Sequence, residues 1–314
     1  MNNRKYLIYP KNREKVQWKV PALFNNDEAA LILNDVCEEL GIRKPIQSVY
    51  GSIMCSWGGG RASKIKELDE KKAEQIINDF NNRNISCCFT FSAARITKEE
   101  LEDKTGNALL KMASNSSYQN YAIVTSDLLT DYIRDKYPNI KLISSILRPV
   151  YEIDDYNETP DYYNELCKRY DKVVIRPDFC FDNRYLKKLK YKNKIEILAN
   201  LTCLSKCVLS RKHYDLASDQ EKGIRTDFDF DFCNKEMRNV QSVFNTNVLS
   251  REDIDRLVKL GFTNFKLKGR NSGAYIFLDT LSRYIFEPTG ISQNISRLVG
   301  LKLEQFGIDP FNNG

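Results

Sequence analysis

Four cysteines lie where they could bind a metal or an iron–sulfur cluster. Cys55 ends the apolar run SVYGSIMC, whereas Cys203 and Cys207 lie in NLTCLSKCVLS, directly after another strand-like run. Cys233 follows a long polar stretch, in the segment DFDFC. Four thiolates can bind a tetrahedral zinc ion or a [4Fe–4S] cluster equally well. We therefore expect a metal centre on these four cysteines, either a [4Fe–4S] cluster or zinc.

The spacing of the cysteines disfavours some kinds of metal site. Structural zinc sites favour two C-x2-C pairs, and the sequence has none. Radical-SAM enzymes use C-x3-C-x2-C, but Ser210 stands where the third cysteine should be. Free cysteines also pack as small apolar residues, and this interpretation suits the cysteines inside helical or strand patterns, namely Cys37, Cys87, Cys88 and Cys167. Cys180 is ambiguous because FCFDN also follows a strand end.

His213 is the only histidine in the chain. No two-histidine metal site can therefore form within one chain, and any catalytic triad must use His213. Its ring could donate or accept a proton near neutral pH, because an unperturbed imidazole titrates there. It could equally support a neighbouring site residue or simply be exposed. We take His213 as the candidate catalytic residue.

Arginines follow several predicted strands and could hold an anionic substrate. Arg148 lies in ILRP, Arg176 and Asp178 lie in VIRPD, and Arg270 ends the segment KLKGR. A guanidinium group binds carboxylate or phosphate through paired hydrogen bonds. We therefore predict that Arg148, Arg176, Asp178 and Arg270 contact the substrate. The alternative is that these arginines pair with acidic loop residues at the surface.

The composition indicates a globular cytoplasmic protein. The 314 residues are 42% hydrophobic and 29% charged, and no apolar run approaches the roughly 20 residues that span a bilayer. The N-terminal segment lacks a signal-peptide core, so we expect reduced thiols and no membrane partner. The net charge of +6 weakly favours an anionic partner. The run KKLKYKNK (187–194) could contact nucleic acid, although a solvated helix face explains it more simply.

Strand-like and helix-like segments alternate along the chain. Helical patterns cover 27–40 and 71–82, and a capping box at Ser250 and Asp253 opens a helix that Gly261 ends. Eight strands alternating with helices predict an α/β fold of the TIM-like (β/α)8 barrel type, with an open doubly wound sheet as the alternative. We predict a barrel over 1–290 with an insertion around 208–245, and a tail over 291–314. The expected strands cover 5–9, 48–53, 85–92, 121–125, 141–147, 172–175, 195–199 and 262–268, with 240–244 as a ninth candidate.

Several of these segments, in this order, resemble the peptidase U32 family, often labelled collagenase-like. The first strand ends in Tyr-Pro (YLIYP), SVYGS precedes a cysteine, and NLTCLSKCVLSRKHYD stands where the family carries its cysteine-rich segment. LSREDIDRLVKLGFTNFKLKGR resembles the family's late helix–strand unit. The resemblance covers most of residues 1–285. It implies a TIM-like barrel that holds an oxygen-sensitive [4Fe–4S] cluster on four cysteines.

The resemblance also implies a function. Family members are implicated in oxygen-independent hydroxylation of ubiquinone precursors and in RNA base hydroxylation, and some work as pairs of related chains. By position, Cys55, Cys207 and Cys233 match cluster ligands, with Cys203 as the fourth and Cys180 in reserve. We expect an iron–sulfur enzyme, or a subunit of one, that modifies an anionic substrate. The alternatives are a metal-dependent peptidase, as the family label indicates, and a non-catalytic partner subunit that bears the cluster.

Overall fold

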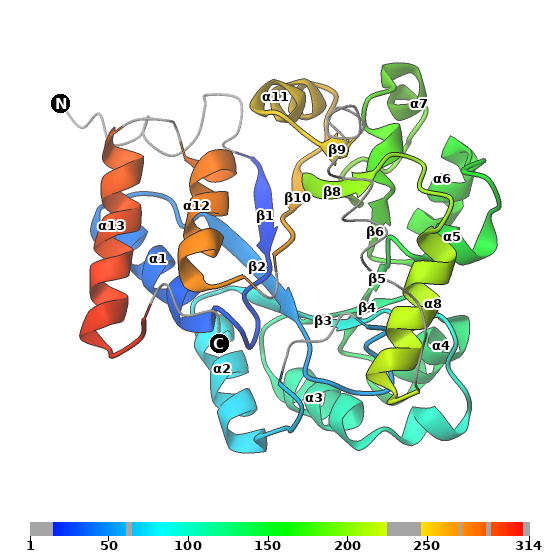
Figure 1. Ribbon diagram of the computed structural model, residues 1–314, viewed down its shortest axis with the longest axis horizontal. Helices are drawn as coiled ribbons and strands as arrows, with labels where there is room; N and C mark the ends of the chain where they lie inside the picture. The colour runs from blue at the N-terminus through cyan, green and yellow to red at the C-terminus, as the bar shows by residue number, and fades with distance from the viewer. Residues whose placement is uncertain (1–14, 61–64, 225–245, 270–271, 287–289, 310–314) are drawn as a thin grey trace.

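Eight parallel strands close into a barrel in the computed structural model, which describes residues 15–60, 65–224, 246–269, 272–286 and 290–309 (Figure 1). The strands follow one another around the barrel in the order β1-β10-β7-β6-β5-β4-β3-β2. The predicted TIM-like (β/α)8 barrel is thereby confirmed. The eight strands are β1 (Gln17–Val20), β2 (Ile46–Gly51), β3 (Ser86–Phe91), β4 (Tyr121–Val124), β5 (Lys141–Ser144), β6 (Lys172–Ile175), β7 (Ile195–Leu198) and β10 (Asn264–Lys266).

Helices connect the strands and form the outer layer of the barrel (Figure 1). Side chains at the helix starts satisfy free backbone N–H groups, as in the capping box between Ser250 and Asp253 that the sequence predicts. The connecting helices are α1 (Asp27–Glu39), α2 (Glu70–Asn82), α3 (Lys104–Asn115), α4 (Asp127–Lys136), α5 (Arg148–Glu152), α6 (Pro160–Arg169), α7 (Asn183–Lys187), α11 (Arg251–Lys259) and α12 (Ala274–Ile285). Short 3-10 turns lie at η2 (Glu99–Glu102) and η3 (Pro177–Phe179).

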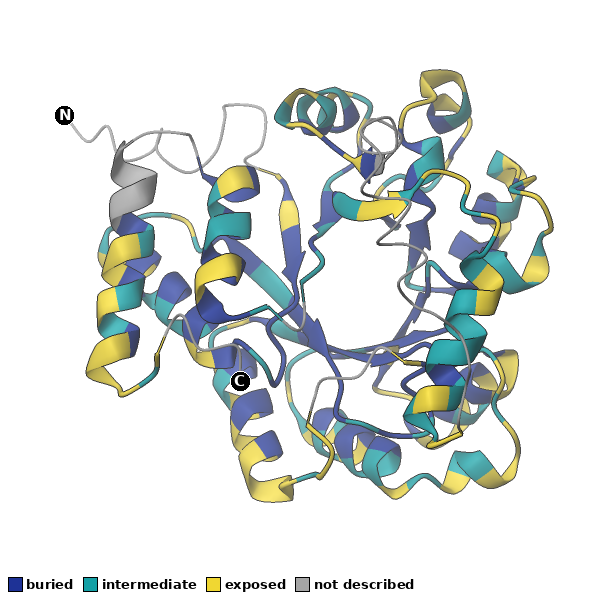
Figure 2. Cartoon of the chain, in the orientation of Figure 1, coloured by how far each residue is buried: buried dark blue, intermediate teal, exposed yellow. Residues whose placement is uncertain are grey.

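The strands are buried on both faces, as expected for a parallel sheet that helices cover (Figure 2). Residues that point outward, such as Phe89 and Val124, pack against the helices in the main hydrophobic core. Residues that point inward form a smaller cluster inside the barrel, made of Tyr50, Cys88, Ile123, Ile143 and Val174. The inward positions therefore build the floor of any site at the mouth of the barrel.

The first barrel strand differs from the prediction. It was predicted at residues 5–9, which lie outside the described residues, but the barrel is closed by Gln17–Val20. The pattern was missed because Lys19 lies on the inward face of this strand and is nevertheless buried. The other seven predicted barrel strands overlap observed ones, and the predicted ninth strand (240–244) also lies outside the described residues.

An insertion between β7 and α11 lies over the barrel mouth. It contains β8 (Asn200–Leu204), the helix α8 (Ser210–Glu221) and β9 (Thr246–Val248), and β8 pairs with β9 in antiparallel orientation. The N-terminal half of α8 packs beside α5, and the backbone of Gly60 donates a hydrogen bond to Glu221 at its C-terminal end. The helix therefore spans from the β5 side to the β2 side of the barrel.

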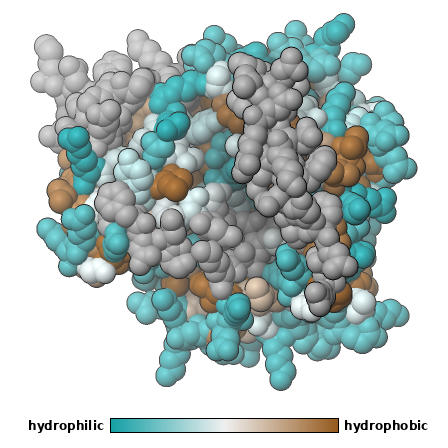
Figure 3. Space-filling model, in the orientation of Figure 1, coloured by the Kyte–Doolittle hydropathy of each residue, from teal (hydrophilic) through white to brown (hydrophobic). Residues whose placement is uncertain are grey.

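A last helix, α13 (Gly290–Gln305), packs against α1 and α12 outside the strand barrel (Figure 1). Val299 and Leu303 of this helix are fully buried in the main core. On the face that Figure 3 shows, the described residues at the periphery are mostly hydrophilic, with small hydrophobic patches between them. Within the described part of the chain, no helix is long and apolar enough to cross a membrane.

Candidate functional site at the barrel mouth

A cavity of about 470 Å³ lies at the carboxyl ends of the barrel strands. This is the end at which TIM barrels place their active sites, because the βα-loops meet there. Strand side chains form the floor, and α8 contributes one wall with His213, Tyr214 and Ala217. The floor is lined by Tyr50, Thr90, Ile123, Ser145, Val174, Leu198 and Lys266. We refer to this space as the mouth cavity.

Two lysines give the mouth cavity a positive charge. Among the described residues that line it, Lys266 and Lys268 are the only ones with a charged side chain, and no carboxylate joins them. The Lys266 ammonium group lies 3.9 Å from the centre of the Tyr50 ring, in a cation–π contact. The backbone N–H of Lys268 donates to Asn200 over 2.6 Å, which ties the end of β10 to β8. The charged side chains among the described residues that line the cavity are therefore both basic.

Thr90 adds an unpartnered polar atom to the same cavity. Only 3% of Thr90 is exposed, and its hydroxyl oxygen has no hydrogen-bond partner among the described residues. A buried hydroxyl without a partner costs about 1–3 kcal/mol, so such groups usually bind water or a ligand. Thr90 lines the floor next to Ile123 and Ser145. It can therefore hydrogen-bond to a molecule that occupies the cavity.

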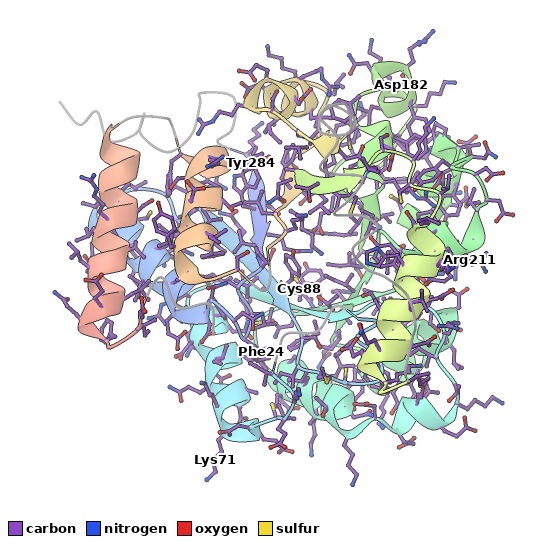
Figure 4. The ribbon with its side chains drawn as sticks, viewed as in Figure 1. Phe24, Lys71, Cys88, Asp182, Arg211 and Tyr284 are labelled. Atoms are coloured by element: carbon purple, nitrogen blue, oxygen red, sulfur yellow. The ribbon has the colours of Figure 1, made fainter. Side chains whose placement is uncertain are left out.

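Further charges lie inside the barrel. Lys19 and Glu196 are both almost fully buried and form an ion pair with 2.5 Å between nitrogen and oxygen. Burial alone would raise the pKa of Glu196, but Lys19, Lys266 and Lys172 overcome it and hold the pKa below its usual value. Burial and the charge of Lys19 lower the pKa of Lys172. Cys88, labelled in Figure 4 inside the ring of strands, is uncharged at neutral pH because burial raises its pKa.

A second cavity of about 280 Å³ adjoins the mouth cavity. We call it the side cavity. Its apolar wall comes from β5, α5 and β8, through Ile146, Leu147, Val150, Leu201 and Leu204. Its polar residues include Tyr156, Arg176, Asp178, Ser210 and Asn247.

The structure brings five of the predicted site residues to these cavities: Arg176, Asp178, Cys203, Cys207 and His213. Cys203, Cys207 and His213 line the side cavity, and Cys203 and His213 also line the mouth cavity. Cys203 is exposed and Cys207 is half-buried. The two cysteines flank the turn between β8 and α8, and His213 lies in the first turn of α8. Asp178 also lines the side cavity, where it receives hydrogen bonds from Ser205, Lys206 and Asn247.

Two of the three predicted substrate arginines, Arg148 and Arg176, have partners within the protein. Arg176 lines the side cavity, but its guanidinium pairs with the buried Glu158 at 2.5 Å and stacks on Tyr156. Arg148 lines neither cavity. It is buried, with Asp127 at 2.9 Å and Glu152 at 2.6 Å. The structure thus gives Arg148 a bracing role between α4 and α5, and it places Arg176 beside the candidate site with its charge already balanced.

Cys55 lies apart from the other predicted metal ligands. It belongs to the hydrophobic core, and burial, followed by the charge of Asp103, raises the pKa of its thiol. Its loop lies at the C-terminal end of α8, where Glu221 contacts Gly60, whereas Cys207 precedes the N-terminal end. A helix of this length measures roughly 17 Å. Cys180, the reserve ligand, is also fully buried.

The described cysteines therefore do not fit a four-thiolate cluster by themselves. Two of the four expected ligands share a cavity wall, and Cys55 lies away from them. Within the described ranges, no group of three or more His, Cys, Asp or Glu residues is arranged to hold a metal ion. Cys233, like the predicted substrate ligand Arg270, lies outside the described residues.

The residues that define the mouth cavity were not predicted from the sequence. Lys266 and Lys268 lie in the segment NFKLKGR, in which a strand was predicted and only Arg270 was expected to contact the substrate. Their alternation with Leu267 at the end of a strand could have identified them, because residues two apart share one face of a strand. Nothing local marks Thr90, whose position depends on the closure of the barrel.

No protein-family model matches the sequence, and no curated protein matches it. A solved structure of a U32 peptidase matches with a TM-score of 0.50 and 13% sequence identity, over 83% of this chain and 95% of that chain. An aldolase from Thermotoga maritima matches at 9% identity over 98% of this chain and 76% of that one. Its TM-score of 0.25 is too low to indicate a shared fold. At such low identity the first match shows the fold alone. The chain thus has the barrel fold of a U32 peptidase structure, in agreement with the sequence resemblance.

Proposed function

We propose that this chain is a barrel enzyme that binds an anionic substrate in the mouth cavity. The observation that carries the proposal is the pair Lys266 and Lys268, the only charged side chains among the described residues that line this cavity. Lys172 and Lys19 lie deeper in the barrel, where one carboxylate, Glu196, interacts with all three interior lysines. The interior thus adds positive charge beneath the substrate. A carboxylate or phosphate group would receive hydrogen bonds from the two lysines and from Thr90.

His213 is the proposed proton donor or acceptor in this site. It lies on the wall of α8 above the lysines, in reach of both cavities. An imidazole can transfer protons near neutral pH, which suits general acid–base catalysis. This proposal assigns the anion contacts to Lys266 and Lys268, because they line the mouth cavity and Arg148 and Arg176 do not.

The reaction class is proposed from the family resemblance. Oxygen-independent hydroxylation, or another redox modification of the anion, is the first candidate. Peptide hydrolysis is the second, because the solved structure that shares this fold is a U32 peptidase. Assays of peptide turnover and of anaerobic substrate oxidation separate the two candidates.

The binding proposal is tested by calorimetric titration of the protein with acetate and with inorganic phosphate. We expect Lys266→Met and Lys268→Met each to weaken anion binding by about tenfold, which corresponds to about 1.4 kcal/mol. The matched control is Lys141→Met, an exposed lysine at the opposite end of strand β5. Equal affinities in all three variants and the parent would contradict the proposal.

An iron–sulfur cluster stays a prediction, and in this proposal Cys203, Cys207 and Cys233 hold it, whereas Cys55, which lies apart in the core, does not. Iron and sulfide analysis of protein purified without oxygen tests it, with about four irons per chain as the positive result. The position of Cys55 in the core predicts that Cys55→Ser keeps the iron, whereas Cys203→Ser loses it. A parent protein without iron and sulfide would contradict the cluster, and loss of iron in a folded Cys55→Ser protein would contradict the separation of Cys55 from the site.

A further inference from the structure

The mouth cavity and the side cavity meet at a shared wall. Five residues line both of them: Ile146, Leu201, Cys203, His213 and Tyr214. The two cavities therefore adjoin along these side chains, and a ligand long enough to reach past them would occupy both. The two spaces differ in size, about 470 Å³ for the mouth cavity and about 280 Å³ for the side cavity.

The side cavity has the chemistry of an apolar subsite. Its wall of aliphatic side chains comes from three elements, with Leu147 and Val150 around the start of α5 and Leu201 and Leu204 on β8. Small-molecule sites are typically built in this way, from apolar walls with a few placed polar groups. Burial of an alkyl or aromatic group against these walls is favourable in proportion to the apolar area that leaves water.

The charges around the side cavity are already neutralised by the protein. Arg176 pairs with Glu158 and stacks on Tyr156, whose ring centre lies 4.0 Å from the guanidinium carbon. The Asp178 carboxylate receives three hydrogen bonds from β9 and from the turn after β8. An anionic group gains little here, because each of these charges already has a partner, so the side cavity suits the apolar part of a ligand better than its charged part.

We propose that the substrate is an amphipathic anion, with its carboxylate or phosphate group in the mouth cavity and an apolar tail in the side cavity. This inference rests on the proposed function and names the substrate class. Cys203 and His213 lie on the shared wall, so they face the part of the substrate where the anionic head joins the tail. The reacting carbon atoms are accordingly those next to the anionic group.

The test is a calorimetric titration with a series of linear carboxylates: acetate, butyrate, hexanoate and octanoate. Each buried methylene is expected to strengthen binding about fourfold until the side cavity is full. Val150→Trp and Leu204→Trp fill this cavity from two different elements, so each should abolish the gain with chain length and leave acetate affinity unchanged. Leu301→Trp, at an exposed position on α13, is the control and should behave as the parent does.

The outcomes separate this inference from the proposed function. Acetate binding that depends on Lys266 but does not strengthen with chain length overturns the apolar subsite and leaves the anion site standing. Acetate affinity that does not change in Lys266→Met overturns both the apolar subsite and the anion site. If affinity still increases with chain length in both tryptophan variants, the tail binds elsewhere, and this result also overturns the inference.

Discussion

Glu196 is the residue on which the charge balance of the barrel interior depends. It is fully buried, it pairs with Lys19, and the charges of Lys266 and Lys172 also act on it. A buried ion pair adds little net stability, but removal of one partner leaves the other charge buried and uncompensated. Glu196 thus permits three lysines to lie inside one barrel, and through Lys266 it supports the proposed anion site.

We therefore expect Glu196→Gln to lower the free energy of unfolding by about 3–5 kcal/mol. Glu165→Gln is the matched control, because Glu165 forms an exposed ion pair with Lys168 and its loss should cost under about 1 kcal/mol. Urea denaturation of the three proteins at neutral pH measures both values. Equal losses in the two variants would mean that the interior lysines do not rely on Glu196.

At the scale of elements, the ends of helices hold the loops of the site in place. The helix α8 carries His213 at its start, and its end is held by Lys222, which pairs with Glu100 at 2.5 Å. Arg95, after β3, pairs with Asp215 and Asp219 of the same helix. These contacts connect α8 to the β3 side of the barrel and so position its wall of the mouth cavity.

Asp27, the first residue of α1, should make the stability of the folded protein depend on pH. Burial, followed by the nearby charge of Glu28, raises the pKa of Asp27 to about 7. The folded state therefore binds a proton more tightly than the unfolded state, whose Asp titrates near 3.9. The contribution of Asp27 to the free energy of unfolding is fully present below about pH 4. It falls as the pH rises to about 7, by on the order of a few kcal/mol.

Asp27→Asn should remove this dependence, so that the variant gains stability over the parent between pH 4 and pH 8. Urea denaturation at the two pH values measures the change. Asp161→Asn, an exposed acidic residue in the first turn of α6, should leave the dependence as it is in the parent. The same slope with pH in Asp27→Asn and the parent would contradict the assignment.

At the scale of the whole molecule, α13 extends the core beyond the barrel. Val299 and Leu303 contribute to the same hydrophobic core as the barrel strands, and Lys302 pairs with Glu39 of α1 at 3.0 Å. The segment expected as a tail beyond the barrel is thus a helix that covers α1 and α12 over its described length. Its buried face ties the end of the chain to the first βα unit.

Leu303→Ala should lower the free energy of unfolding by about 2–5 kcal/mol, the usual cost of a cavity in a packed core. Leu301 lies two positions away on the same helix, but 57% of it is exposed, so Leu301→Ala should cost under about 0.5 kcal/mol. Thermal and urea unfolding of both variants measure the difference. Similar effects of the two substitutions would show that α13 does not pack as described.

Local patterns predicted most of the strands and several helices from the sequence. Strand β6 matches its prediction at both ends, and α11 begins at the predicted capping box and is followed by Gly261, whose φ is +100°. Such features depend on residues within a few positions of one another, so the sequence contains the whole signal. The apolar runs also predicted the barrel, because eight buried parallel strands leave a repeated and recognisable pattern.

Tertiary structure decided which of the candidate residues meet. Lys19 can lie in a strand because Glu196 of β7, the strand beyond β10, pairs with it. Cys55 lies apart from Cys203 because α8 separates their loops. Arg148 and Arg176 follow strands as predicted, yet acidic residues from other segments pair with them. The sequence determined the residue types and the order of elements, whereas long-range packing and charge pairing decided that lysines, and not these arginines, line the mouth cavity.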